Sequence, residues 1–401
     1  MSSRNLSFLT NEYQDLVNQR LDWVHRVLEG PSTAECIVEG KKVIMLCSNN
    51  YLGLSNHPKL KEAAIKAINT HGVGSGSVRA IAGNMDLHEE LEKKFARFKE
   101  QQGVMITQSG YAANAGVIPQ LAPSEEDYIL SDELNHGSII DGVRLSKATK
   151  GVYKHSDMDS LEKKMKEIES LNPRRILLVT DGVFSMDGDY AKLDEIQKIV
   201  EPYGAIIYVD DAHGDGVLGS NESGKGIVDH FKLQGKVHIE MNTFSKAMGV
   251  VGGAITGSKA LVSWARNKTR TYLLSGSHPP PVVAASIAAV DIIQKEPLVP
   301  NLWKNINYFR NEIINLGFDH DITRKSQTAI IPVILGENDI AREFSNLLFN
   351  QGIFALPIVF PMVPKGTARI RVMMNATLSK DQLDVALSAF EKAGKSLKVL
   401  N

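Results

Sequence analysis

Cysteine is nearly absent from this chain, since only Cys36 and Cys47 occur among its 401 residues. Two thiols are too few for a disulfide framework or a four-thiolate metal site, and we expect no metal. Long apolar runs are absent as well, so the sequence predicts no membrane span. Residues 1–5 lack the apolar core and cleavage pattern of a signal peptide. We therefore expect a protein of the reducing cytoplasm.

An excess of either charge sign is also lacking. Lys and Arg number 45 and Asp and Glu number 46, which leaves a formal net charge of −1. This balance gives no support for a nucleic-acid or membrane-surface partner. The chain has no G-x-G-x-x-G after its first strand and no Walker-type loop, which disfavours nicotinamide and ATP as ligands.

Short apolar strands alternate with helical stretches between residues 103 and 257. We predict strands at 104–107, 128–131, 151–154, 176–180, 205–210, 237–241 and 252–256. This alternation is typical of an α/β fold with a mostly parallel sheet and helices on both faces. Ligands of such folds bind beyond the carboxyl ends of the strands.

Helices and a second α+β domain are expected outside that region. An N-terminal helix is predicted over 11–28, with Leu16, Leu21, Val24 and Leu28 at roughly helical spacing. Asp86 and Glu89 predict a capping box for the helix that follows them. The last third predicts strands at 329–335 and 369–373 and helices at 282–294 and 380–397.

Lys246 and Asp210 form the most informative pair of the sequence. Each residue follows a buried strand, and the two strands are neighbours along the chain. Singly, each residue has a plain structural explanation, as a solvated lysine or a helix cap. Together they suit pyridoxal phosphate (PLP), which needs a lysine amine for its Schiff base and a carboxylate against its ring nitrogen.

Polar residues follow other strands of the same series. Gly110 and Tyr111 open a helix, whose free N–H groups suit a phosphate, although an ordinary capping turn is the simpler reading. His136 is placed to stack on a cofactor ring or to cap its own helix. Ser185 is placed to bond the cofactor or a substrate carboxylate, and His213 to donate to the cofactor's phenolic oxygen.

Arg369 and Arg371 alternate on a predicted strand and therefore share one face. A guanidinium there suits bidentate binding of an amino-acid carboxylate. Spacing alone does not decide which arginine meets the substrate.

The motifs around these residues closely resemble the α-oxoamine synthases, a family of fold-type I PLP-dependent enzymes. The resemblance runs from about Cys47 to Gly394 and rests on five motifs in family order. They are residues 48–54 (SNNYLGL), 135–142 (NHGSIIDG), 180–188 (TDGVFSMDG), 210–213 (DDAH) and 243–246 (TFSK).

The resemblance implies roles for individual residues. Lys246 matches the Schiff-base lysine, Asp210 the partner of the ring nitrogen, and His213 the donor to the phenolic oxygen. His136 matches the histidine stacked on the ring. The implied phosphate contacts are Gly110, Tyr111, Thr243 and Ser275, and the implied substrate contacts are Asn49, Ser185 and Arg371.

The resemblance also implies the architecture. We expect an N-terminal helix and arm at 1–45, a large PLP-binding domain with a mostly parallel seven-stranded sheet at 46–283, and a small α+β domain at 284–401. Ser275 lies in a segment like one that reaches the phosphate of the neighbouring subunit, which implies a homodimer with shared sites.

Within the family, segments 138–145, 181–187 and 363–371 look most like glycine C-acetyltransferase. The expected reaction is therefore condensation of glycine with acetyl-CoA to give 2-amino-3-ketobutyrate and CoA. The alternative is 8-amino-7-oxononanoate synthase, which uses L-alanine and pimeloyl-CoA, or an enzyme that performs both reactions. Asn375 and Leu378 depart from the family pattern, so amino-acid and acyl preference stay open. An aminotransferase, a sulfur-amino-acid lyase or a non-catalytic partner subunit are the competing classes.

Overall fold

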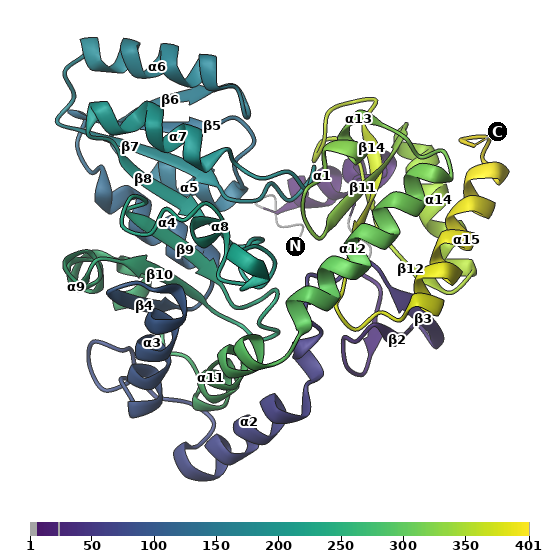
Figure 1. Ribbon diagram of the computed structural model, residues 1–401, viewed down its shortest axis with the longest axis horizontal. Coiled ribbons are helices and arrows are strands. Elements are labelled where there is room, and N and C mark those ends of the chain that lie inside the picture. The colour runs from purple at the N-terminus through teal and green to yellow at the C-terminus, as the bar shows by residue number, and fades with distance from the viewer. Residues whose placement is uncertain (1–5, 23–24, 401) are drawn as a thin grey trace.

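The structure is a computed structural model that describes residues 6–22 and 25–400. Residues 1–5, which were predicted to lack a signal peptide, and Val24, which was predicted to lie in the first helix, are outside the described residues. Figure 1 shows two lobes, one built on a large sheet and the other on two small sheets. Among the described residues, no helix is long and apolar enough to cross a membrane.

The large sheet contains all seven strands that the sequence predicted, in the order β4-β10-β9-β8-β7-β5-β6. Their bounds are β4 Gly103–Thr107, β5 Asp127–Asp132, β6 Thr149–Tyr153, β7 Arg175–Asp181, β8 Ile206–Asp210, β9 Ile239–Thr243 and β10 Gly253–Gly257. Only β10 runs against its neighbours. The other six strands run in one direction, so their carboxyl ends meet at one edge.

Both faces of this sheet are buried, as its apolar strands predict. In β7, Leu178 belongs to one hydrophobic cluster, whereas its neighbours Leu177 and Val179 belong to another. The helices of this lobe are α3 Asp86–Lys99, α4 Gly110–Leu121, α5 Gly137–Leu145, α6 Met158–Ser170, α7 Leu193–Val200, α8 Ile227–His230, α9 Lys259–Lys268 and α10 Arg270–Leu273. Single 3₁₀ turns lie at Leu54–Asn56, Glu201–Tyr203 and Ser220–Glu222.

The second lobe joins both ends of the chain. One of its sheets pairs β1 Leu28–Glu29, β2 Glu35–Val38 and β3 Lys41–Met45 with β12 Ile353–Phe354. The other has the order β11-β14-β13, with bounds β11 Ile330–Gly336, β13 Pro357–Ile358 and β14 Ala368–Met373. Its helices are α12 Leu298–Asn315, α13 Asp321–Lys325, α14 Asn338–Asn350 and α15 Lys380–Ser396.

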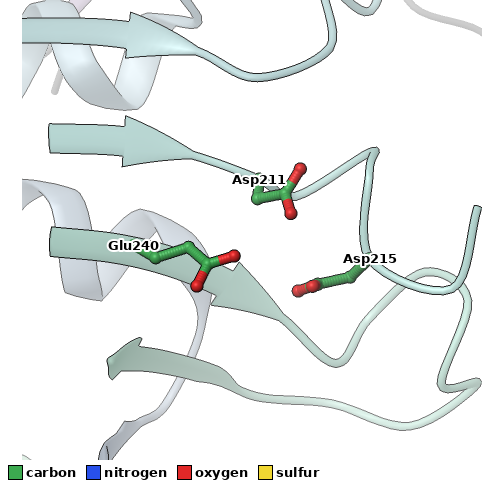
Figure 2. A group of neighbouring side chains, drawn as sticks. All are labelled: Asp211, Asp215 and Glu240. Carbon is green, nitrogen blue, oxygen red and sulfur yellow. The ribbon is translucent and has the colours of Figure 1, made fainter. Parts of the chain in front are cut away.

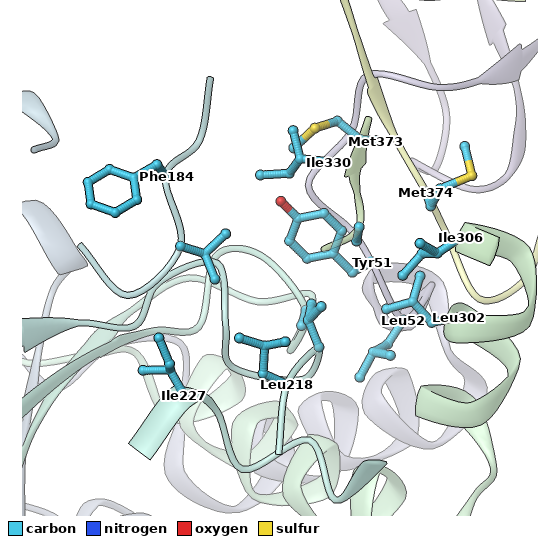
Figure 3. Close-up of a cluster of buried hydrophobic side chains, with 14 of the residues drawn as sticks. Tyr51, Leu52, Phe184, Leu218, Ile227, Leu302, Ile306, Ile330, Met373 and Met374 are labelled. Atoms are coloured by element: carbon cyan, nitrogen blue, oxygen red, sulfur yellow. The ribbon is translucent and has the colours of Figure 1, made fainter. Parts of the chain in front are cut away.

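One hydrophobic cluster spans the two lobes (Figure 3). It includes Phe184 and Leu218 from the large lobe, Tyr51 from the segment after β3, and Ile306 and Met374 from the second lobe. Helices α2 Pro58–His71 and α11 Pro280–Lys295 pack on each other and contribute side chains to the same cluster. The domain limits at 45/46 and 283/284 stay predictions, and α11 runs unbroken through the second of them.

Two local predictions were wrong. The first helix, α1, covers Ser7–Asn18 and ends well before Leu28, which instead pairs in β1. Arg20 adopts the left-handed conformation (φ 55°) and Leu21 N–H bonds the Leu16 carbonyl, which is a helix-terminating Schellman bond. The helix α3 is capped from Met85, whose N–H donates to Nδ1 of His88, so the predicted Asp86–Glu89 box does not form.

Candidate active site

A cavity of about 190 Å³ lies at the carboxyl edge of the large sheet. Strands β4, β5, β7, β8 and β9 each end beside it, because parallel strands present the same end to one edge. The cavity is lined by Ser109, Gly110, Tyr111, His136, Ser138, Asp181, Ser185, Asp210, Ala212, His213, Met241, Thr243 and Lys246. Eight residues predicted from the sequence are therefore brought together: Gly110, Tyr111, His136, Ser185, Asp210, His213, Thr243 and Lys246.

Lys246 follows β9 and places its amine in this cavity. Burial lowers the pKa of the amine to about 8, although Asp210 and Asp181 raise it, and Arg371 adds to the lowering. A lysine that loses its proton this readily is a nucleophile and a base near neutral pH.

Asp210 ends β8 and is almost completely buried. Its Oδ2 accepts a hydrogen bond from the Asn114 side-chain amide at 2.7 Å, and its Oδ1 accepts from Ala212 N–H at 3.0 Å. The Tyr208 hydroxyl donates to Asn114 Oδ1 at 2.7 Å, which fixes the orientation of that amide. Sequence reasoning missed Asn114, although it stands one helical turn after Gly110 and so on the same face of α4.

The N-terminus of α4 forms another part of the cavity wall. Ser109 caps the helix by accepting from Ala112 N–H, and no partner is recorded for the N–H groups of Gly110 and Tyr111 among the described residues. A Cβ on Gly110 would come within 3.2 Å of the Met241 side chain and 3.4 Å of Thr243. Close backbone approach and free N–H groups suit a phosphate.

His136 caps its own helix, and its stacking on a cofactor ring stays a prediction. Its Nδ1 accepts from Ser138 N–H at 3.2 Å and so caps α5, while its ring lines the cavity. Burial lowers the pKa of the imidazole, Asp210 raises it, and Lys246 lowers it. The His136 N–H donates to the Asp181 carboxyl at 2.9 Å. Burial, with Asp210 nearby, raises the pKa of Asp181 well above its ordinary value.

The two arginines of β14 reach the same loop, as residues sharing one strand face must. Arg369 is buried and bonds the Met186 carbonyl at 3.0 Å and the Asp187 carboxylate. Arg371 bonds the Ser185 carbonyl at 3.1 Å and has no carboxylate partner among the described residues. Arg369 is thus tied to a structural acid, whereas Arg371 retains donors for a ligand.

Three predicted residues lie outside the cavity lining. Arg371 is one of them, although Arg371 adds to the lowering of the pKa of both Lys246 and His213 and therefore stands close by. Asn49 is half-buried, and its Oδ1 has no hydrogen-bond partner within residues 6–22 and 25–400. Ser275 lies beside Gly276, which forms an isolated β-bridge with Val78 in the glycine-rich segment 72–79.

Asp211, Asp215 and Glu240 form a buried acidic cluster outside the cavity lining (Figure 2). Its centre holds the Lys99 ammonium, whose Nζ lies 2.6 Å from Asp215, 2.7 Å from Glu240 and 3.6 Å from Asp211. The lysine supplies the cation for these acids, so the geometry is that of a buried ion network rather than a metal centre.

The donor set of the cavity fits PLP. An amine of lowered pKa, a buried carboxylate and an unpaired helix N-terminus stand around one small cavity. These groups match the cofactor's aldehyde, ring nitrogen and phosphate, respectively.

Comparison with known proteins identifies similar chains over the full length. Residues 41–390 match the family model of aminotransferase class I and II. The 8-amino-7-oxononanoate synthase of Thermoanaerobacter pseudethanolicus is 51% identical over 400 residues, which cover 100% of both chains. The 8-amino-7-oxononanoate synthase 1 of Bacillus subtilis is 48% identical over 374 residues, or 93% of each chain.

Solved structures give the same fold. Serine palmitoyltransferase of Sphingomonas wittichii superposes with a TM-score of 0.93 at 29% identity and covers 100% of both chains. A second serine palmitoyltransferase structure, solved with PLP, has a TM-score of 0.91 at 28% identity and also covers 100% of both chains. The 8-amino-7-oxononanoate synthase of Francisella tularensis has a TM-score of 0.74 at 26% identity, covering 88% of this chain and 98% of its own.

These names support the alternative reaction better than the glycine and acetyl-CoA reaction that the sequence segments favoured. The fold-type I architecture and the PLP cofactor predicted from the sequence are confirmed.

Proposed function

Because the chain belongs to the aminotransferase class I and II family, and within it to the PLP-dependent α-oxoamine synthases, we propose that it condenses L-alanine with pimeloyl-CoA. The products are 8-amino-7-oxononanoate, CoA and carbon dioxide. The coarser assignment, a PLP-dependent enzyme of acyltransferase type, follows from family membership. The observation that carries the finer proposal is the name shared by relatives of about half identity over the whole chain.

The reaction forms one carbon–carbon bond and breaks the C–S bond of the thioester and the bond between the α-carbon and its carboxylate. The α-proton is removed before the new bond forms, and the α-carbon takes up a proton again after carbon dioxide has left. The α-carbon of alanine attacks the thioester carbonyl, the C–S bond breaks, and CoA leaves as its thiol. The carboxylate of alanine leaves as carbon dioxide. PLP, when bound, withdraws electrons from the bonds at the α-carbon.

Residues of this chain supply the positioning and the proton transfer. With its pKa lowered to about 8, the Lys246 amine is available both to hold the cofactor and to remove the α-proton. Asp210, held by Asn114 and Ala212, would hold the cofactor's ring nitrogen in its protonated form. Arg371 binds the substrate carboxylate through the donors that Ser185 leaves free.

The test is a panel of amino acids against acyl-CoA thioesters, followed by release of free thiol and by mass spectrometry of the product. L-alanine, glycine and L-serine are each paired with acetyl-CoA, pimeloyl-CoA and palmitoyl-CoA. We expect the highest kcat/KM with L-alanine and pimeloyl-CoA. The Lys246→Ala variant is the matched negative control.

The glycine reaction is the second outcome that this panel distinguishes. A kcat/KM for glycine with acetyl-CoA at least tenfold above that for alanine with pimeloyl-CoA would overturn the proposal in favour of glycine C-acetyltransferase. Comparable values for both pairs would identify the promiscuous enzyme. Transfer of the amino group from the amino acid to an oxo acid in the absence of CoA would instead identify an aminotransferase and overturn the acyltransferase assignment.

A further inference from the structure

Tyr51 is completely buried although it carries a hydroxyl group. Its ring lies in the hydrophobic cluster between the lobes, where Leu52, Ile330 and Met373 also lie (Figure 3). Its phenolic oxygen lies 2.7 Å from Nδ1 of His213. Among the described residues, this nitrogen is the only hydrogen-bond partner of that hydroxyl.

Both groups of this pair have well-defined protonation near neutral pH. Burial raises the pKa of the Tyr51 phenol, with Arg371 acting weakly against it, so the hydroxyl keeps its proton. Burial also holds the pKa of His213 well below its ordinary value, and Lys246, Arg371 and His136 lower it further. His213 is therefore neutral and carries a single ring proton, on either Nδ1 or Nε2.

The single acceptor decides between these two tautomers. With the proton on Nδ1, that N–H would donate to Tyr51, and the Tyr51 hydroxyl would be a buried donor without an acceptor. Such groups are rare in folded proteins because they are costly. With Nδ1 bare, Tyr51 donates to it and the pair is satisfied.

We propose that Tyr51 is a positioning residue that holds His213 in the tautomer with its proton on Nε2. No partner is recorded for Nε2 among the described residues, and His213 lines the cavity. This tautomer presents an N–H donor to an oxygen of bound PLP or substrate, whereas the other would present a lone pair to it. The inference rests on the proposed role of His213 as a hydrogen-bond donor in the cavity and identifies Tyr51 as the residue that fixes its tautomer.

The backbone of Tyr51 is also held from the second lobe. Its carbonyl accepts from Ala376 N–H at 2.7 Å, and the neighbouring Asn50 carbonyl accepts from the Asn375 side-chain amide. Asn375, which departs from the family pattern, is therefore one of the residues that hold the Tyr51 segment in place. This gives the hydroxyl a fixed position against the imidazole.

The ring-nitrogen NMR spectrum of full-length protein labelled with ¹⁵N-histidine tests this inference without turnover. The spectra are taken with and without PLP, and His213→Asn identifies the signals of that residue. We expect Nε2–H in the wild type by at least tenfold over Nδ1–H. In Tyr51→Phe, which removes only the hydroxyl, that ratio should fall at least tenfold.

Tyr153→Phe is the matched control, because Tyr153 is equally buried but lies on β6, away from the cavity. It should leave the His213 signals unchanged. Wild-type His213 with its proton on Nδ1, or an unchanged ratio in Tyr51→Phe, would overturn the inference. If Tyr51→Phe folds poorly, the wild-type spectrum still tests the predicted Nε2–H tautomer of His213. Since the tautomer is read without substrate, a wrong substrate assignment would leave this result intact and appear only in the thiol-release panel.

Discussion

At the scale of single residues, hydrogen-bond partners separate side chains that the sequence pattern leaves equivalent. Arg369 and Arg371 stand two residues apart on β14 and reach the same loop. Arg369 is neutralised by Asp187, whereas the partners of Arg371 among the described residues are a main-chain carbonyl and a methionine sulfur. The structure thus gives an independent reason to assign Arg371 to the substrate carboxylate.

We expect Arg371→Ala to raise the KM of the amino acid at least tenfold, a loss of about 1.4 kcal/mol, with a smaller effect on acyl-CoA. Arg371→Lys should rescue binding poorly, because a point charge does not reproduce the planar fork. Steady-state kinetics with varied amino acid measure this. Arg369→Ala should instead lower stability, and normal amino-acid kinetics in Arg371→Ala with damaged kinetics in Arg369→Ala would reverse the assignment.

Asp210→Asn should retain PLP but slow turnover by more than about tenfold, since breaking a buried charge pair typically costs about 3–5 kcal/mol. An amide does not hold a ring nitrogen protonated. Cofactor absorbance and kcat report the two effects separately. A variant that retains more than about a tenth of the wild-type rate has an activation free energy raised by less than ~1.4 kcal/mol. Such a small change would contradict the role of this carboxylate.

At the scale of elements, His155 holds the cavity loop to the sheet. Its Nδ1 lies 2.9 Å from Asp132 at the end of β5, and its Nε2 lies 3.0 Å from Asp189, just after the turn that carries Ser185. The ring also packs edge-on against Phe184, with 4.3 Å between centroids. Both nitrogens donate, so the imidazolium is the form that this bridge requires.

Burial lowers the pKa of His155, but the hydrogen bonds to Asp132 and Asp189 outweigh it and raise the pKa to about 10. Since the folded pKa lies above the ordinary 6.5, the stabilisation is complete below that value and is lost as pH rises through 10. We expect His155→Gln to cost on the order of 3 kcal/mol at acidic to neutral pH.

Urea unfolding of both proteins across the pH range measures this difference in free energy. It should shrink steadily above neutral pH. The exposed Lys166→Gln, which removes a surface pair with Glu162, should leave the free energy of unfolding almost unchanged at every pH. A difference for His155→Gln that does not change with pH would show that the bridge is not ionic.

At the scale of the whole molecule, the position of Ser275 favours an active site that includes a residue from a second subunit. Ser275 was predicted to reach a phosphate, yet it does not line the cavity of its own chain. Its neighbour Ser277 is held by hydrogen bonds to Ser75 and to the carbonyls of Ser77 and Gly83. This position suits the proposed homodimer, in which Ser275 serves the cavity of the partner subunit.

Mixing two inactive variants, Lys246→Ala and Ser275→Asp, should therefore restore activity. In a mixed dimer, one site receives both changes and the other receives neither, so statistical exchange restores about a quarter of the wild-type activity. Activity is measured by thiol release after subunit exchange, and mass by sedimentation. Mixtures that stay inactive although exchange has occurred would place Ser275 outside the partner's site.

The sequence by itself determined the large sheet and most of the polar residues that line the cavity. Strand runs at known positions deliver Gly110, His136, Asp210 and Lys246 to strand ends, and parallel strands bring those ends to one edge. These inferences need only local pattern and strand direction. The family motifs, which are also local, identified the cofactor.

Tertiary structure decided everything that depends on partners far apart in the chain. Asn114 meets Asp210 across 96 residues, and Tyr51 meets His213 across 162. The Asp187 carboxylate, 182 residues from Arg369, pairs with that arginine and leaves Arg371 without a carboxylate partner among the described residues. No spacing or periodicity encodes such pairs, because they exist only when packing has closed the chain on itself and removed water from each hydrogen bond.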